Sequence, residues 1–260
     1  MMKLLISDLD GTIIHNHSTI NQEDIDALHQ AAESGVEIAF ASGRMQPEIE
    51  AVMQQLNLRV HTISQNGAYV HMSDGELVSQ HAFDRDRLAA LAKAGEGTPF
   101  LTMMCGPDHY FVEKLTAHAE EIGSRLMAPM HVIPDARNRL GQDIVSGKIS
   151  FFGEVEKLRA FMKQLKAEHG SAIDAYISDI DCMDVMPAGV SKGTGVKVLQ
   201  ERLKISPEET VCVGDSFNDI SMFAGTPHSY AMAASHADVK SAAAHEAESV
   251  AAIIRRLLNP

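Results

Sequence analysis

Two aspartates separated by one residue stand directly after a short apolar run near the start of the chain. Residues 4–6 predict a buried parallel strand, and Asp8-Leu9-Asp10-Gly11-Thr12 comes at its end. In an open α/β sheet, ligands bind at the carboxyl ends of the strands. Two like charges this close together favour a cation beside them, and carboxylate oxygens together with phosphate favour Mg²⁺. A carboxylate can also attack a phosphoryl group as a nucleophile.

Three further polar motifs end candidate strands or open a helix later in the chain. They are Ser42-Gly43-Arg44 after a strand at 36–41, Lys192 at the start of a helix, and Gly214-Asp215-Ser216-Phe217-Asn218-Asp219 after a strand at 210–213. Because parallel strands end at a common edge of their sheet, these residues are predicted to meet there despite their separation in sequence.

The acidic residues take different roles in this prediction. Asp8 would attack phosphorus in line. Asp10 is expected on the same side of the strand, because side chains alternate, and would protonate the leaving oxygen and later accept a proton from water. Asp215, together with Asp8 and a backbone carbonyl near Asp10, would hold Mg²⁺. Asp219 would orient Lys192 or a metal-bound water.

The remaining polar groups are suited to binding the phosphoryl group itself. Ser42 offers a hydroxyl and neighbouring backbone N–H groups, and Asn218 offers an amide donor. Lys192 supplies a positive charge against the charge that spreads over the phosphoryl oxygens in the transition state. Gly11 lets the backbone approach the ligand closely.

The chain alternates predicted strands and helices at both of its ends. Predicted strands at 4–6, 36–41 and 60–64 are separated by helices that begin after Asn21 and near Pro47. The α/β pattern returns with a helix capped by Ser191, strands at 210–213 and 229–232, and a helix over 250–258. This βαβαβ order predicts an α/β fold: a Rossmann-like, doubly wound parallel sheet.

The middle of the chain changes to a mixed α+β pattern with apolar residues of its own. Helices are predicted over 83–93, 117–125 and 154–168, and strands over 100–104, 110–113, 148–152, 172–177 and 183–186. We therefore expect a core domain of residues 1–82 and 187–260, interrupted by an inserted α+β domain of residues 83–186.

Charge and composition limit the class of partner. The formal net charge is −13 over 260 residues, which argues against a nucleic-acid partner. The sequence shows neither a signal peptide nor an apolar run of membrane-spanning length, so we expect a cytoplasmic location and no membrane partner. The three cysteines lack C-x-x-C spacing, so neither a disulfide framework nor a zinc site is predicted.

In order and spacing, the motifs resemble those of the haloacid dehalogenase-like phosphatases. The resemblance rests on Asp8-x-Asp10-Gly11-Thr12, Ser42-Gly43-Arg44, Asn66-Gly67, Lys192 and Gly214-Asp215-x-x-Asn218-Asp219, and it covers essentially the whole chain. The large insert after Asn66-Gly67 is similar to that of the Cof-type subgroup. The resemblance implies a Rossmann-like core with a mobile cap that sets substrate specificity. It also implies Mg²⁺-dependent hydrolysis of phosphate monoesters, commonly of sugar phosphates and related small metabolites, through an aspartyl-phosphate.

Carried over by position, the resemblance implies a role for each matching residue. Asp8 would be the nucleophile and Asp10 the acid/base, and Mg²⁺ would be held by Asp8, the Asp10 carbonyl and Asp215. Phosphate or substrate contacts would come from the following residues: Leu9 (through its backbone), Ser42, Gly43, Arg44, Asn66, Lys192 and Asn218. Two alternatives stay open, because Arg44 could form a surface salt bridge and Asn66-Gly67 could be only a turn.

Two other functions remain open at this stage. A phosphomutase would return the phosphoryl group to a second position on the same sugar. A non-enzymatic phospho-switch of the receiver type would also use an acidic pair, Mg²⁺ and a lysine, although it needs no large insert in its sheet. The substrate is expected to be a small phosphorylated metabolite, and the sequence is compatible with either a monomer or a homodimer.

Overall fold

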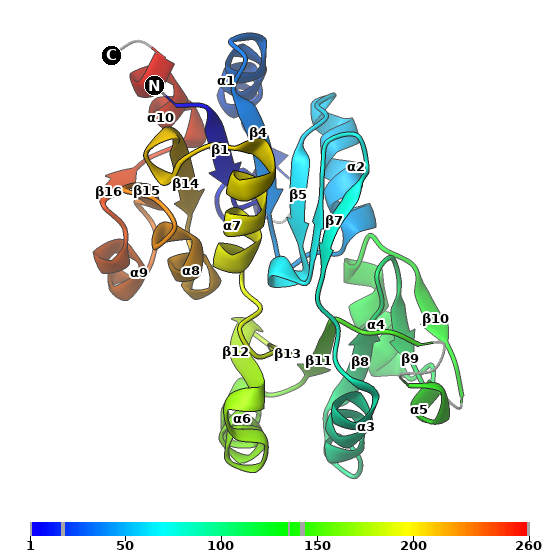
Figure 1. Cartoon of the computed structure of the whole chain (residues 1–260). Coiled ribbons are helices and arrows are strands. Elements are labelled where there is room, and N and C mark those ends of the chain that lie inside the picture. The colour runs from blue at the N-terminus through cyan, green and yellow to red at the C-terminus, as the bar shows by residue number, and fades with distance from the viewer. Residues whose placement is uncertain (1, 17–18, 135, 141–143, 259–260) are drawn as a thin grey trace. The chain divides into compact units, whose positions relative to one another are not determined.

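The computed structural model describes residues 2–16, 19–134, 136–140 and 144–258 (Figure 1). The chain divides into two compact units. Unit 1 comprises Met1–Gly43, Val52–Ser79 and Ser191–Pro260, and unit 2 comprises Arg44–Ala51 and Gln80–Val190. Compared with the domains expected from sequence, the main difference is the segment 44–51, which groups with unit 2.

Unit 1 is built on an eight-stranded sheet with the order β16-β15-β14-β1-β4-β5-β6-β7. The first six of these strands pair in parallel, whereas β6 runs antiparallel to β5. The strands are β1 (Leu4–Ser7), β4 (Glu37–Ala41), β5 (His61–Ser64), β6 (Tyr69–His71), β7 (Leu77–Gln80), β14 (Thr210–Gly214), β15 (His228–Met232) and β16 (His245–Ala247). The predicted doubly wound α/β fold is confirmed.

The central strand β1 is buried on both of its faces. Leu4 and Ile6 belong to an apolar cluster on one face, and Leu5, which points the other way, is also fully buried. Burial on both faces is typical of a parallel sheet covered by helices. The helices of this part of the chain are α1 (Gln22–Glu33), α2 (Gln46–Leu56), α7 (Lys192–Leu203), α8 (Ile220–Phe223), α9 (Ala237–Ala242) and α10 (Val250–Leu258).

Helix α7 begins where the sequence predicts. The Ser191 hydroxyl accepts a hydrogen bond from the Thr194 N–H (3.3 Å), and the Thr194 hydroxyl accepts one from the Ser191 N–H (3.0 Å). This reciprocal capping box satisfies backbone donors that the first turn of a helix leaves unpaired. The predicted cap at Ser191 is therefore confirmed, and it sets the position of Lys192 at the first residue of the helix.

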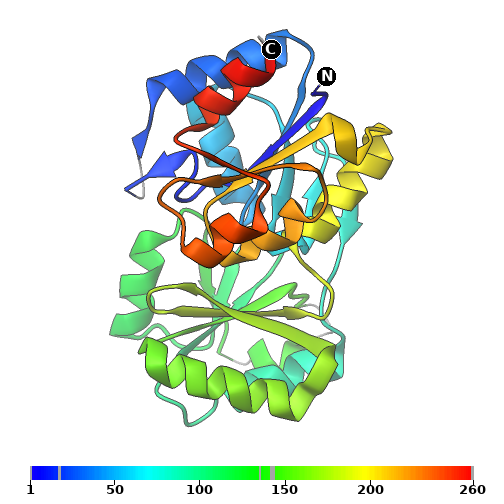
Figure 2. The same cartoon turned by 90° about the vertical axis from the view of Figure 1, so that its left-hand side faces the viewer.

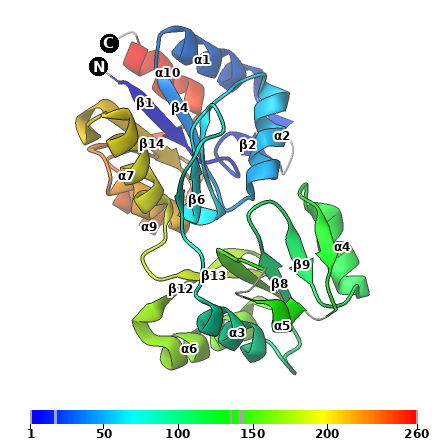
Figure 3. The ribbon, with the colours of Figure 1, turned by 45° about the vertical axis from the view of Figure 1, so that its right-hand side comes forward.

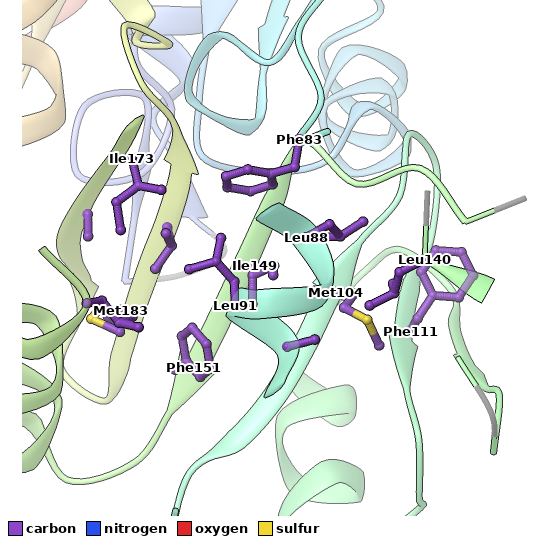
Figure 4. Packing of buried hydrophobic residues seen from close by; sticks show 14 of the residues in the cluster. Phe83, Leu88, Leu91, Met104, Phe111, Leu140, Ile149, Phe151, Ile173 and Met183 are labelled. Atoms are coloured by element: carbon purple, nitrogen blue, oxygen red, sulfur yellow. The ribbon is translucent and has the colours of Figure 1, made fainter. Parts of the chain in front are cut away.

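Unit 2 contains a six-stranded sheet with the order β10-β9-β8-β11-β13-β12. Its strands are β8 (Leu101–Cys105), β9 (Tyr110–Val112), β10 (Met130–Val132), β11 (Lys148–Phe152), β12 (Ile173–Asp179) and β13 (Cys182–Pro187). Its helices are α3 (Arg85–Ala94), α4 (Ala117–Arg125), α5 (Ala136–Arg139) and α6 (Val155–His169), with α6 lying across the sheet (Figure 2). Leu88 and Leu91 of α3 pack against Ile149 and Phe151 of β11 (Figure 4), so unit 2 has an apolar cluster of its own.

Several short elements were not predicted from the sequence. These are β2 (Ile14–His15), β3 (Thr19–Ile20), β10, β16, α5, α8, α9 and the 3₁₀ turns η2 (Gly170–Ala172) and η4 (Phe217–Asp219). Elements of two to six residues are too short to carry a clear hydrophobic period. Two other 3₁₀ turns agree with the sequence: η1 (Gln65–Gly67) contains the turn considered at Asn66-Gly67, and η3 (Pro207–Glu209) lies where Ser206-Pro207-Glu208-Glu209 favours a short helical turn. The helix expected from residue 83 starts at Arg85, because the Asp84 carboxylate caps it by accepting the Arg87 N–H (2.9 Å). In the part of the chain that the structure describes, no helix is long and apolar enough to span a bilayer.

Helices α1 and α10 lie side by side (Figure 3), and a buried carboxylate joins them. Asp24 of α1 is 1% exposed, and its Oδ1 accepts a hydrogen bond from the Ala251 N–H in the first turn of α10 (2.7 Å). Asp24→Ala is expected to lower the free energy of unfolding by about 1–3 kcal/mol, because it leaves a buried N–H without its partner.

Urea denaturation checks this expectation, with Asp26→Ala as the control. Asp26 is exposed on the same helix and accepts a hydrogen bond from the exposed Gln22 amide (2.8 Å), so its replacement makes the same change of residue type without touching α10. Equal destabilisation by the two variants would show that the link between α1 and α10 contributes nothing.

Candidate active site

Lys192 is the centre of a buried ion-pair network in unit 1. Its Nζ lies 2.5 Å from Asp8 Oδ1 and 2.6 Å from Asp219 Oδ1. The side chains of Lys192 and Asp219 are 0% exposed, and that of Asp8 is 6% exposed. The first turn of α7, the end of β1 and the turn after β14 therefore converge on one ammonium group.

The charges in this network do not balance. Burial disfavours the charged form of Lys192, but the carboxylates of Asp219 and Asp8 outweigh it and raise the pKa of Lys192 above its ordinary value. Burial also raises the pKa of Asp8 well above its ordinary value; Lys192 opposes this shift, and the charges of Asp219 and Asp215 add to it. Three carboxylates around one ammonium leave excess negative charge that a cation would offset.

Asp8 is positioned by the sheet and Asp10 by a turn. The Asp8 N–H donates to the Val213 carbonyl (2.9 Å), which continues the pairing of β1 with β14. After β1 ends at Ser7, the Leu9 carbonyl accepts from the N–H groups of Ile13 (2.9 Å) and Ile14 (2.7 Å). Asp10 lies exposed in this turn, outside β1. Strand alternation therefore does not set its direction, contrary to the argument from sequence.

Gly11 makes room for the carboxylate of Asp215. The φ angle of Gly11 is +85°, and a Cβ there would lie 2.3 Å from Asp215 Oδ2. The Thr12 hydroxyl is 3.4 Å from Asp215 Oδ1. Burial, and then the charge of Asp219, raises the pKa of Asp215 to about 6. Glycine is required here both by the left-handed backbone and by the close approach.

Asp8, Asp215 and Asp219 each offer one oxygen, and these oxygens lie within 4.8 Å of one another. Asp219 already uses both of its oxygens, since Oδ1 binds Lys192 and Oδ2 accepts the N–H groups of Asp215 and Ser216 (2.9 Å each). Asp219 is thus a positioning residue. Asp8 and Asp215 are the carboxylates best placed to bind a divalent cation.

A second polar group forms where β4 and β5 end. The Ser42 N–H donates to the Ile63 carbonyl, and the Ser42 carbonyl accepts from the Asn66 N–H (both 2.9 Å). The Asn218 amide donates to Asn66 Oδ1 (3.0 Å). A Cβ on Gly43 would lie 3.4 Å from the Asn66 amide, so Gly43 also belongs to this group. Asn66 Nδ2 and Asn218 Oδ1 are buried and have no hydrogen-bond partner among the described residues.

Asn66-Gly67 is a turn with an unusual backbone. Gln65, Asn66 and Gly67 all have positive φ angles, of 47°, 54° and 102°. A Cβ on Gly67 would lie 2.1 Å from the Ser191 carbonyl oxygen, so only glycine fits beside the cap of α7. Strained backbone of this kind clusters at functional sites. The sequence left open whether Asn66-Gly67 is only a turn or binds the substrate; the residues do form a turn, and that turn carries the buried Asn66 amide.

Two glycines whose importance was not predicted also admit neighbouring groups. A Cβ on Gly214 would lie 2.4 Å from Asp219 Cγ, and one on Gly193 would lie 2.1 Å from the Ser221 carbonyl oxygen. Gly214 directly precedes Asp215, and this position in the motif was the one sequence feature that could have indicated its importance.

Arg44, a predicted substrate contact, belongs to unit 2, where its Nη1 donates to Met127 Sδ (3.2 Å).

Comparison with known proteins identifies the family. A family model described as haloacid dehalogenase-like hydrolase matches residues 5–252. The chain belongs to this family. The resemblance drawn from the motifs, including its Cof-type subgroup, is confirmed, and so is the hydrolase class of enzyme.

Relatives and solved structures of this haloacid dehalogenase-like hydrolase agree with that assignment. Phosphatase YwpJ of Bacillus subtilis is 26% identical over 277 residues, covering 93% of each chain. The HMP-PP phosphatase of Klebsiella pneumoniae is 25% identical and covers 89% of this chain and 84% of its own length. A haloacid dehalogenase-like hydrolase from B. subtilis has a TM-score of 0.88 at 25% identity, covering 98% of this chain and all of its own.

Gly11→Ala is expected to weaken divalent-cation binding by about tenfold or more, because it displaces the Asp215 carboxylate. Both Gly11→Ala and Gly35→Ala are expected to lower stability by about 1 kcal/mol through their positive φ angles. Gly35 (φ +79°) has no atom within 4 Å of the added Cβ, so it is a matched control for backbone strain. Isothermal titration with Mg²⁺ measures the difference. Equal cation affinities in the two variants would contradict the role of Gly11.

Proposed function

We propose that this hydrolase is a Mg²⁺-dependent phosphatase that cleaves phosphate monoesters of small metabolites, with sugar phosphates as the favoured class. The observation that carries the proposal is the buried Lys192 between Asp8 and Asp219, with Asp215 beside them. The names of the relatives from B. subtilis and K. pneumoniae support phosphatase chemistry.

Asp8, Asp215 and the carbonyl of Asp10 would hold the Mg²⁺. The fit rests on the excess negative charge of the network and on the space that Gly11 leaves beside Asp215. Bound there, Mg²⁺ would supply positive charge to the phosphoryl oxygens. Lys192, already bound to Asp8, adds its own positive charge from within the protein.

In the first step, a carboxylate oxygen of Asp8 attacks phosphorus and forms an aspartyl-phosphate, while the bond from phosphorus to the leaving oxygen breaks. Asp10 donates its proton to that oxygen. The backbone of Leu9 and the side chains of Ser42, Asn66 and Asn218 would hold the phosphoryl oxygens, with Gly43 leaving space for them. The unpartnered Asn66 Nδ2 supports this assignment, because a buried donor requires an acceptor.

In the second step, water attacks the phosphorus of the aspartyl-phosphate and Asp10 accepts its proton. The bond between phosphorus and the Asp8 oxygen breaks, which releases inorganic phosphate and restores the carboxylate. Unit 2 would set substrate specificity, with Arg44 as a candidate substrate contact. Steady release of inorganic phosphate would separate this function from that of a phosphomutase or a receiver-type switch.

Asp8→Asn is expected to lower turnover of p-nitrophenyl phosphate on the order of 10³-fold or more, because the amide cannot form the covalent intermediate. Phosphate release in saturating Mg²⁺ measures the effect, and circular dichroism checks that the fold is retained. Asp26→Asn, on an exposed position of α1, controls for a generic loss of charge. Turnover that is unchanged in Asp8→Asn would eliminate Asp8 as the nucleophile.

Mg²⁺ binding is expected to weaken as pH falls. Burial raises the pKa of Asp215 to about 6 and that of Asp8 above its ordinary value, so protons compete with the cation on the acidic side. We expect affinity to fall by about tenfold or more between roughly pH 7.5 and pH 5, with protons released on binding at the lower pH. Calorimetry in buffers of different ionisation enthalpy measures both quantities. An affinity that does not change with pH would contradict this account.

A further inference from the structure

Glu48 is a buried carboxylate in the first turn of α2, shortly after the proposed phosphate-binding residues Ser42 and Gly43. It is 4% exposed. Its Oε2 accepts hydrogen bonds from the Met45 N–H (2.9 Å) and the Tyr110 hydroxyl (2.8 Å), and its Oε1 accepts one from the Met127 N–H (3.0 Å). The proposed phosphatase mechanism does not use this residue.

Part of the arrangement is ordinary helix capping. The Met45 carbonyl accepts from the N–H groups of Glu48 (3.0 Å) and Ile49 (3.1 Å), so Met45 stands at the entrance of α2. A glutamate in the first turn often reaches back to the N–H of such a residue. Capping alone does not require burial, however, and burying a carboxylate is strongly unfavourable unless hydrogen bonds offset the loss of water.

The two further donors come from the inserted stretch Gln80–Val190. Tyr110 lies on β9, and Met127 follows α4. Burial, and then the negative charge of Glu48, raises the pKa of Tyr110 well above its ordinary value, so the hydroxyl remains a neutral donor. The same carboxylate thus binds the entrance of α2 and two separate parts of the insert.

The short segment between Ser42 and Met45 is fixed at both of its ends. Ser42 is bonded to the Ile63 carbonyl and the Asn66 N–H, and Met45 is bonded to Glu48. The boundary between the two units falls between Gly43 and Arg44. Loss of the Glu48 carboxylate would remove the hydrogen bond at the Met45 N–H, while the Met45 carbonyl would keep its bonds to the Glu48 and Ile49 N–H groups.

We propose that Glu48 is a positioning residue that links the phosphate-binding loop to the inserted stretch. It fixes the backbone from Gly43 to Met45 through the Met45 N–H, and it ties that backbone to Tyr110 and Met127. Binding of the phosphoryl group therefore depends on contacts made within unit 2. This inference rests on the proposed function, which assigns phosphate binding to Ser42 and Gly43.

Glu48→Gln tests the link with little change of size. An amide has one donor end and one acceptor end, so its NH₂ must face either Met127 N–H or the pair formed by Met45 N–H and Tyr110. Tyr110→Phe removes one donor without altering α2. Glu50→Gln is the matched control, because Glu50 is exposed on the same helix, where its carboxylate accepts the Gln46 amide (3.0 Å).

For Glu48→Gln we expect the KM for p-nitrophenyl phosphate and the inhibition constant of inorganic phosphate to rise by about tenfold or more. Tyr110→Phe is expected to raise both in the same direction by a smaller factor, and Glu50→Gln to leave both unchanged. The Mg²⁺ activation constant is expected to stay within about twofold, since Glu48 bonds to Met45, Tyr110 and Met127 rather than to the cation-binding carboxylates. A lower unfolding temperature with unchanged KM and inhibition constant would show a merely structural role and overturn the proposal.

Hydrogen–deuterium exchange separates failure of this inference from failure of the proposed function. If the wild-type protein hydrolyses no phosphate ester, the proposed function fails, and exchange of the amides in residues 42–46 decides the link alone. Faster exchange in both Glu48→Gln and Tyr110→Phe supports the link, and exchange equal to wild type overturns it. If Glu48→Gln does not fold, Tyr110→Phe decides between the two outcomes by the same measurements.

Discussion

One ammonium group buried between two carboxylates is the interaction on which the site depends. Lys192 has no exposure to solvent, so its charge persists only because Asp8 and Asp219 lie within 2.5 and 2.6 Å. Its position follows from the capping box that starts α7 at Ser191, and the absence of a side chain at Gly67 lets the Ser191 carbonyl approach. Removing Lys192 would leave the buried carboxylates of Asp8 and Asp219 without their positive partner. The start of α7, the end of β1 and the turn after β14 therefore all depend on this one side chain.

The second constraint is the excess of negative charge that this arrangement leaves. Asp215 adds a third carboxylate, held close by the turn at Gly11, while Asp219 is occupied by Lys192 and two backbone N–H groups. A cation and a phosphate ester together would complete the site. The cation would offset the negative charge of the carboxylates, and the phosphoryl oxygens would accept hydrogen bonds from donors such as Asn66 Nδ2. The same excess charge links cation binding to pH.

The sequence was sufficient wherever a local pattern decides the structure. Buried strands with acidic ends, the cap at Ser191 and the return of the α/β pattern after the insert could all be predicted from neighbouring residues. The structure departs from prediction where distant contacts decide. Asp10 lies in a turn after the end of β1. Asn66 and Gly67 both take positive φ angles, and Gly67 lies beside the Ser191 carbonyl. Glu48 accepts a hydrogen bond from Tyr110, 62 residues later in the sequence, and no local pattern could reveal such a contact.

The central claim is that Asp8, held by Lys192, takes up the phosphoryl group. Acid quenching of the wild-type protein during turnover, followed by borohydride reduction, converts an aspartyl-phosphate to homoserine, and peptide mass spectrometry locates it. We predict homoserine at position 8, with aspartate retained at positions 10 and 215. Phosphate release with no reduced residue, or with reduction at Asp10 or Asp215, would contradict the account.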